Sequence, residues 1–213
     1  MAQGECCGGS GRCKTDAARE PRLHEELLVR YLRGVENFDP RVFDLTDEQT
    51  DQVFTADENA GQWSVRTLLG HLADAELVFT HRIRRIIAED GPVLAIWDQD
   101  AFIDGGIYGP ELRSPVAGFV AAIHTMRRWT AELLLALTPE QWERTAMHPE
   151  QGEIGMLKLV EYATWHVEHH AKFLTQKLDV MLGEREETEA AGGGCGSGCG
   201  CASKQAAASE TTE

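Results

Sequence analysis

The chain has 213 residues, 42% of them hydrophobic, which is enough for one ordinary globular domain with appendages. Its formal net charge of -15 repels phosphate backbones, so we expect no nucleic-acid partner. No stretch approaches the roughly 20 apolar residues that cross a bilayer, and the N-terminus lacks the apolar run of a signal peptide, so we expect no membrane partner and a cytoplasmic location.

Composition divides the chain into three zones. Residues 1–20 and 184–213 are rich in Gly, Ala, Ser, Glu and Cys and nearly lack large apolar side chains. Such segments cannot bury enough apolar surface to offset the entropy lost on ordering, so we predict two disordered tails. Residues 21–183 form the remaining zone, and we predict that they fold as one helical domain.

The first half of this domain predicts two long helices joined by a turn. Apolar residues at three- and four-residue steps predict a first helix from near Pro21 to Val35. The sequence TDEQ (residues 46–49) has the spacing of a capping box and predicts a short helix in the turn. Ser64 can cap a second long helix, whose apolar stripe runs from Val65 to Ile86 and which Gly91-Pro92 ends.

A segment of roughly twenty residues follows, GPVLAIWDQDAFIDGGIYGPELR (residues 91–113), and we expect it to be a loop. Loops of this length in compact domains tend to be functional or mobile. Its acidic and aromatic side chains could form a lid or a substrate wall; the alternative is that the acids are solvated and the aromatics close the end of the bundle. These side chains are Trp97, Asp98, Asp100, Phe102 and Asp104.

The second half predicts two more long helices. Ser114-Pro115 starts a helix whose inner stripe runs to Leu137, and the last helix begins around Gly155–Met156 and continues to about Leu182. We find no internal repeat and no strand pattern. Four long amphipathic helices with connectors predict an all-α fold, a four-helix bundle.

Two histidines lie on the inner stripe of the last predicted helix. At 100° per residue, His166 and His170 share a face with Leu159, Ala163 and Phe173. Imidazoles at positions i and i+4 can chelate one divalent ion, a spacing that helical zinc sites use. The sequence is not a zincin protease signature, which needs H-E-x-x-H, and it lacks the Glu-x-x-His pairs of a di-iron bundle.

A pair of histidines holds a metal weakly, so a third ligand is needed. His71 borders the inner stripe of the second helix and is the best candidate, whereas His81 and His124 lie on outer faces. The positions of His24 and His148 in the sequence give no reason to expect either of them as a ligand. Periodicity alone leaves two interpretations open: a metal site, or core histidines hydrogen-bonded to neighbours.

At this point the sequence resembles a known family. GQWSVRTLLGHLADAE (residues 61–76) followed by HVEHHAKFL (residues 166–174) is similar to the DinB-like superfamily, in particular to its metal-dependent hydrolases and bacillithiol or mycothiol S-transferases. The resemblance implies a four-helix bundle, often a homodimer, in which three histidines hold a divalent metal. The positions that match are His71, His166 and His170.

Three neutral imidazoles would leave at least one position on the ion open, as in catalytic sites, and both Zn²⁺ and Ni²⁺ suit such ligands. A low-molecular-weight thiol or a water could bind there and become a nucleophile. We therefore predict a metal-dependent enzyme, a thiol S-transferase or a hydrolase acting on a small molecule. The alternative is a non-catalytic metal-binding protein that stores, senses or delivers an ion.

Other residues receive weaker assignments. Asp74 and Glu76 could orient the ligands from a second layer, and Trp63 and Trp165 are interpreted as packing residues. All six cysteines lie in the tails, so no disulfide framework shapes the domain. Their thiolates on glycine-rich chains could bind additional metal, or they could be redox-labile thiols only. They are Cys6, Cys7, Cys13, Cys195, Cys199 and Cys201.

Overall fold

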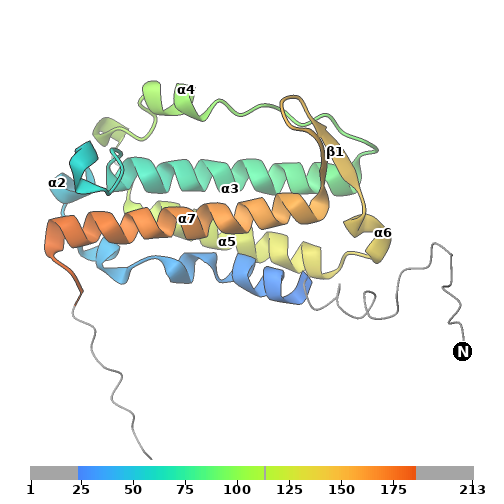
Figure 1. The fold of residues 1–213 in the computed structure, drawn as a ribbon, viewed down its shortest axis with the longest axis horizontal. Helices are drawn as coiled ribbons and strands as arrows, with labels where there is room; N and C mark the ends of the chain where they lie inside the picture. The colour runs from blue at the N-terminus through green and yellow to red at the C-terminus, as the bar shows by residue number, and fades with distance from the viewer. Residues whose placement is uncertain (1–23, 113, 186–213) are drawn as a thin grey trace, which may run out of the picture.

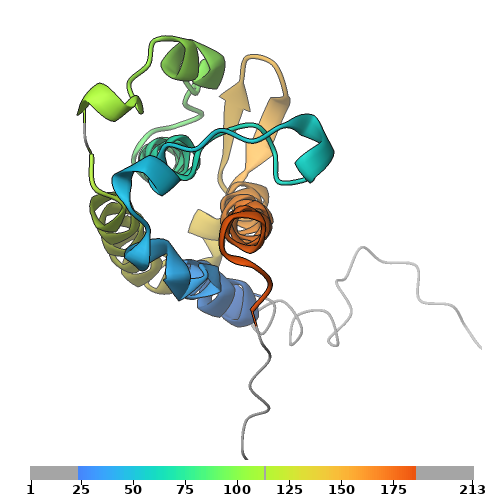
Figure 2. The ribbon, with the colours of Figure 1, turned by 90° about the vertical axis from the view of Figure 1, so that its left-hand side faces the viewer.

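The computed structural model of the chain describes residues 24–112 and 114–185, and four long helices dominate this part. They lie side by side in Figure 1 and are seen nearly end-on in Figure 2. The prediction of an all-α four-helix bundle is confirmed. The long helices are residues 24–32 of the N-terminal helix, α3 (Val65–Ala88), α5 (Val116–Leu135) and α7 (Met156–Leu182).

Short elements connect the long helices. The first connection contains η1 (Gly34–Asn37), η2 (Pro40–Asp44), α2 (Asp47–Thr50) and η3 (Ala56–Glu58). The second contains α4 (Gln99–Asp104) and η4 (Pro110–Leu112), and the third contains α6 (Pro139–Trp142), β1 (Thr145–His148) and β2 (Gly152–Gly155). The tail at 1–20 lies outside the described residues, and so does the tail at 184–213 apart from its first two positions.

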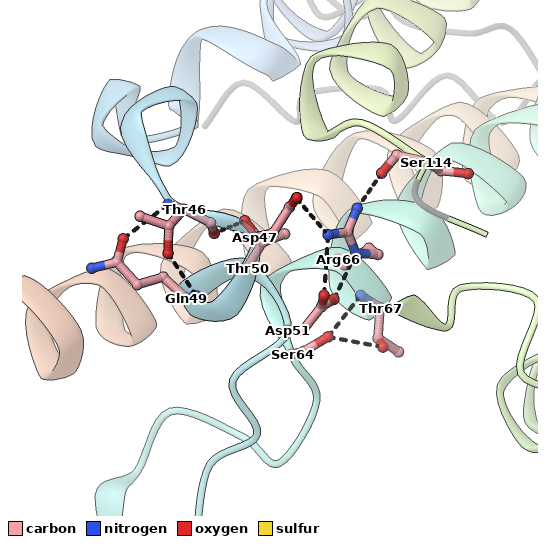
Figure 3. Close-up of polar contacts among 9 residues, drawn as sticks. All are labelled: Thr46, Asp47, Gln49, Thr50, Asp51, Ser64, Arg66, Thr67 and Ser114. Atoms are coloured by element: carbon pink, nitrogen blue, oxygen red, sulfur yellow. Dashed lines mark hydrogen bonds and ion pairs between the residues drawn. The ribbon is translucent and has the colours of Figure 1, made fainter. Parts of the chain in front are cut away.

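The start of α3 is fixed by polar contacts that Figure 3 shows. The Ser64 hydroxyl accepts from the Thr67 amide at 3.1 Å, which confirms Ser64 as the cap. Arg66 is buried, donates to the Asp51 carboxylate at 2.6 Å, and reaches the Ser114 carbonyl at 2.5 Å. One guanidinium therefore joins the N-terminus of α3 to the first connection and to the residues before α5.

The prediction that residues 46–49 start a short helix is confirmed in the same view. The Thr46 hydroxyl accepts from the Gln49 amide at 3.2 Å, and the Gln49 side chain accepts from the Thr46 amide at 2.9 Å. This reciprocal pair caps α2.

We predicted no strands, but two short strands form in the third connection. β1 and β2 pair antiparallel, with Thr145 opposite Gly155 and His148 opposite Gly152. Val93 adds an isolated parallel bridge to Met147. The strands have four residues each, too few for period-two alternation to stand out in the sequence, and the bridge from the preceding connection completes the pairing.

The expectation of a continuous loop at residues 91–113 is also wrong in part, because α4 forms within it. The Asp98 carboxylate caps this helix by accepting from the Ala101 amide at 3.0 Å. Farther along, Tyr108 is buried against α3, and its hydroxyl donates to the Asp74 carboxylate at 2.7 Å. The connection is thus attached to the surface of α3.

The bundle core contains a fully buried ion pair. The Arg127 guanidinium donates to Glu76 at 2.8 Å and to the backbone carbonyls of Tyr31 and Ala163, and the Tyr31 hydroxyl donates to the same carboxylate. All four long helices meet in this network. Because every charge has partners, it can tolerate burial that would otherwise cost several kcal/mol.

No helix within residues 24–112 and 114–185 is long and apolar enough to cross a bilayer.

Candidate metal centre

The packing of α3 against α7 brings together the three histidines that the sequence singled out. His166 and His170 lie one turn apart on α7, and His71 faces them from α3, which runs in the opposite direction alongside (Figure 1). One nitrogen from each ring can be chosen so that all three lie within 4.8 Å of one another. The Nε2 atoms of His71 and His166 are 3.2 Å apart.

These distances fit a metal ion. Two nitrogens at about 2.0–2.1 Å from a tetrahedral ion lie about 3.3 Å apart, close to the observed 3.2 Å. The Nδ1 atoms of all three rings are buried and have no hydrogen-bond partner among the described residues. The nitrogens that face each other in His71 and His166 are Nε2, so the unpaired Nδ1 atoms do not themselves point to the ion, and buried polar atoms of this kind are usually satisfied by water.

The surroundings keep the imidazoles neutral. Burial lowers the pKa of His71 to about 4, and burial together with the other histidines lowers the pKa of His170 to about 4. Burial, followed by repulsion from His170 and His71, lowers the pKa of His166 to about 2. A neutral imidazole has a free lone pair, which is the form that coordinates metal ions.

Aromatic rings cause much of this burial. Trp97 stacks on His71 with ring centroids 5.4 Å apart, and Trp63 lies 5.0 Å from the same ring. On the other side, Phe79 lies 5.8 Å from His166. Trp97 belongs to the connection for which a lid or substrate wall was one of two interpretations, and Asp100 of the same connection is close enough for its charge to act on the pKa of His71.

The cluster consists of three histidines in the part of the chain that the structure describes. Among the described residues, no further histidine, cysteine or acidic side chain belongs to the cluster. A bound ion would therefore keep at least one position for an external ligand, as catalytic sites do and closed structural sites do not.

The remaining histidines lie elsewhere. His81 and His124 are exposed, as predicted. His24 stacks on Trp142, and His148 is buried but accepts a hydrogen bond from the Glu150 amide. His169 stacks on Trp165 at 4.7 Å and takes no part in the cluster.

Neither Asp74 nor Glu76, which we expected to orient the ligands, forms a hydrogen bond with the histidines. Glu76 is bound by Tyr31 and Arg127 in the core, and Asp74 accepts from Tyr108. Periodicity placed both acids near His71 along the chain but could not show which partners the other helices supply. Their observed role is to hold the N-terminal helix, α5 and the α4 connection against α3.

Of the two tryptophans that we interpreted as packing residues, Trp63 fits that interpretation and Trp165 does not. Trp63 is half-buried against the histidines, but Trp165 is 48% exposed and stacks on Tyr162, which is also exposed. Trp97 was expected as a possible wall of the site. Its stacking on His71 could not be predicted, because it depends on how the connection folds over α3.

Comparison with known proteins agrees with this arrangement. A family model described as the DinB superfamily matches residues 30–174, which include all three histidines. The chain belongs to the DinB superfamily. The resemblance drawn from residues 61–76 and 166–174 is thereby confirmed.

Two curated relatives are similar over most of the domain. The chain is 33% identical over 135 residues to the "Putative metal-dependent hydrolase OB0782" of Oceanobacillus iheyensis, covering 63% of this chain and 73% of that protein. It is 26% identical over 156 residues to "Putative metal-dependent hydrolase YfiT" of Bacillus subtilis, covering 72% and 85%.

The solved structure of Bacillus subtilis YfiT has a similar fold. It aligns with a TM-score of 0.56 and 23% identity, covering 84% of this chain and 94% of that one. Its title describes an unusual four-helix bundle topology. At this level of identity, the likeness supports the fold of the present chain.

Proposed function

We propose that this DinB superfamily member is a metal-dependent enzyme that binds one Zn²⁺ or Ni²⁺ through His71, His166 and His170. The observation that carries the proposal is the convergence of three neutral imidazoles from two helices, two of them buried and His170 half-buried, with no fourth histidine, cysteine or carboxylate among the described residues. When bound, the ion supplies Lewis acidity that lowers the pKa of a coordinating thiol or water and so generates a nucleophile at neutral pH.

The chain's own residues would exclude competing water and orient the rings. Trp63, Trp97 and Phe79 surround the imidazoles and lower the local polarity, which strengthens electrostatic interactions there. The reaction would be either hydrolysis of a small molecule or transfer to a low-molecular-weight thiol. The names of the curated relatives support the hydrolase.

The test combines metal content with activity. The triple variant His71→Ala, His166→Ala, His170→Ala should keep its helical circular dichroism spectrum, because the four-helix core lies largely outside the cluster. We expect bound metal to fall by about one ion per chain, and metal-dependent ester hydrolysis or thiol conjugation to fall at least about 100-fold.

The matched control is the double variant His81→Ala, His124→Ala, which removes two exposed histidines and should change neither property. A triple variant that holds as many ions per chain as the wild type would show that the ligand assignment is wrong. A wild-type protein that binds one ion but turns over neither substrate class would favour a storage, sensing or delivery protein.

A further inference from the structure

A pocket lies directly beside one of the three histidines. It is formed between the segment before α3 and the second half of α7, and its volume is about 200 Å³. A cavity of about 150 Å³ with apolar walls is enough to bind benzene. The pocket therefore has room for a substituent of about the size of a phenyl group. Its lining residues include Trp63, Leu68, His170, Phe173 and Lys177.

The pocket walls are mainly apolar and lead to the His170 ring. Trp63 stacks nearly parallel to His170 with centroids 6.2 Å apart, and Phe173 lies 6.2 Å from the same ring. Leu68 and Ala60 close the inner side and are buried. A group in this pocket would contact aromatic faces while the atoms attached to it lie next to the candidate metal centre.

The pocket is held open by hydrogen bonds that involve no ligand. The Lys177 ammonium donates to the carbonyls of Ala60 at 2.7 Å and Gly61 at 2.8 Å, which fixes the segment before α3 against α7. Gly61 has a φ of +71°, and a Cβ there would lie 3.5 Å from the Phe173 ring. The glycine thus permits the turn and keeps the exposed mouth free of a side chain. Preformed pockets of this kind are typical of small-molecule sites.

The charge of Lys177 limits what the pocket can accept. Lys177 is 1% exposed, and its ammonium lies 4.4 Å from the Phe54 ring centroid. Among the described residues the charge of Glu58 acts on it, but no carboxylate forms an ion pair with it. A second cation in the pocket would be repelled across a region of low dielectric constant. An uncharged group faces no such repulsion.

We propose that this pocket binds an uncharged, phenyl-sized substituent of the substrate and so sets the substrate specificity of the enzyme. The inference rests on the proposed function, because it places the substituent beside His170, one of the three proposed ligands of the catalytic ion. The substrate class is then a small ester, amide or electrophile with a neutral aromatic or branched aliphatic arm. Substrates with a cationic arm of the same size should be rejected.

The first experiment tests the pocket without any metal. Benzyl alcohol and benzylammonium, which match in size and differ in charge, are titrated into the isotope-labelled full chain near neutral pH. We expect benzyl alcohol to shift the amide resonances of Gly61 and Gln62 and the indole resonance of Trp63. Benzylammonium should bind at least about 10-fold more weakly. Absence of these shifts with benzyl alcohol would overturn the proposal.

The second experiment connects the pocket to the ion. Acetohydroxamate and phenylacetohydroxamate are titrated by calorimetry into the Zn²⁺-loaded chain, since both can coordinate an open metal position and only one carries the arm. We expect the phenyl arm to improve affinity at least about 10-fold. In Phe173→Ala, which removes one wall, the improvement should fall to about 2-fold or less.

Phe119→Ala is the matched control, because Phe119 is also a half-buried ring in the same half of the core but does not line the pocket. It should keep the full preference for the phenyl arm. If acetohydroxamate binds and the arm adds nothing, the specificity proposal is wrong and the metal centre stands. If neither hydroxamate binds while benzyl alcohol still shifts Gly61, the open metal position is wrong instead.

Discussion

Buried charged side chains hold the helices in the positions that bring the histidines together. Arg127 and Glu76 neutralise each other within hydrogen-bond distance, whereas Lys177 relies on carbonyl oxygens and on the Phe54 ring. The two cases differ in their dependence on pH. An internally paired charge is compensated by its partner, and a buried charge without a counter-ion destabilises the fold while it is protonated.

Lys177 therefore gives a prediction for stability against pH. Burial lowers its pKa from 10.5 to about 8, so between these values the unfolded chain binds more protons than the folded one. Stability should consequently rise with pH through that window. Relative to Lys177→Met, the wild-type free energy of unfolding should increase by on the order of 2 kcal/mol between about pH 8 and about pH 10.

Urea unfolding at a series of pH values measures this difference. Lys172→Met changes an exposed lysine on the same helix and should leave the wild-type pH profile unchanged. Parallel profiles for wild type and Lys177→Met would show that Lys177 does not titrate in this range.

At this scale, the sequence identified the cluster residues but not their environment. Helical periodicity put His166 and His170 on one face and made His71 the best third candidate, and these three rings do converge. Their ligand role stays a prediction. The sequence missed Lys177, because a lysine in an amphipathic helix normally indicates a solvated position. Its burial depends on two carbonyls that come from a distant turn.

At the scale of elements, the α4 connection lies on α3 through a close backbone approach. Gly70 lies in the second turn of α3, and glycine inside a helix usually costs about 0.5–1 kcal/mol relative to alanine. The reason for a glycine here is Tyr108, since a Cβ on Gly70 would lie only 2.3 Å from the Tyr108 ring. The ring occupies the space that a side chain would fill.

We expect Gly70→Ala to displace the α4 connection. The new methyl group should force Tyr108 outward and destabilise the protein by about 1–3 kcal/mol, despite the better helix propensity of alanine. Hydrogen exchange should become faster in residues 93–112. Gly118→Ala, in the first turn of α5, is the control, because its Cβ meets only the Pro115 ring at 3.3 Å.

Unchanged exchange in Gly70→Ala would mean that Tyr108 does not anchor the connection. Tyr108→Phe separates the two contributions, since it keeps the ring against Gly70 and removes only the hydrogen bond to Asp74.

The long helices could be predicted from the sequence better than the short elements. The long helices were predicted with ends close to those observed, because capping residues such as Ser64 and breakers such as Gly91-Pro92 act locally. The hairpin and α4 could not be predicted in the same way. β1 is paired both with β2 and with Val93, which is more than fifty residues earlier, and this partner is invisible in a local pattern.

At the scale of the whole molecule, the role of the cysteine-containing tails remains a prediction. All six cysteines lie outside the described residues. Two interpretations are open: the tails bind metal in addition to the histidine centre, because thiolates on glycine-rich chains suit borderline ions, or their thiols are only redox-labile. On the first interpretation, replacing all six cysteines by serine in the full chain should lower the Zn²⁺ content to about one ion per chain.

Elemental analysis of both proteins after identical metal loading measures this change. The same metal content in both would argue against a loading role for the tails and leave redox-labile thiols as their interpretation. The homodimer and the cytoplasmic location also stay predictions. Sedimentation of the purified chain and fractionation of the source cell would address them.

The two helices that supply the histidines are far apart along the chain, and His71 and His166 are separated by 95 positions. An isolated α7 would offer only two of the three donors of the cluster, so strong capture of an ion at this site has to wait until most of the bundle has assembled. An ion held only by the native state works as a removable cross-link: at about 1,000 times its dissociation constant it adds about 4 kcal/mol to stability. Metal supply would then set how long the protein survives as well as whether it is active.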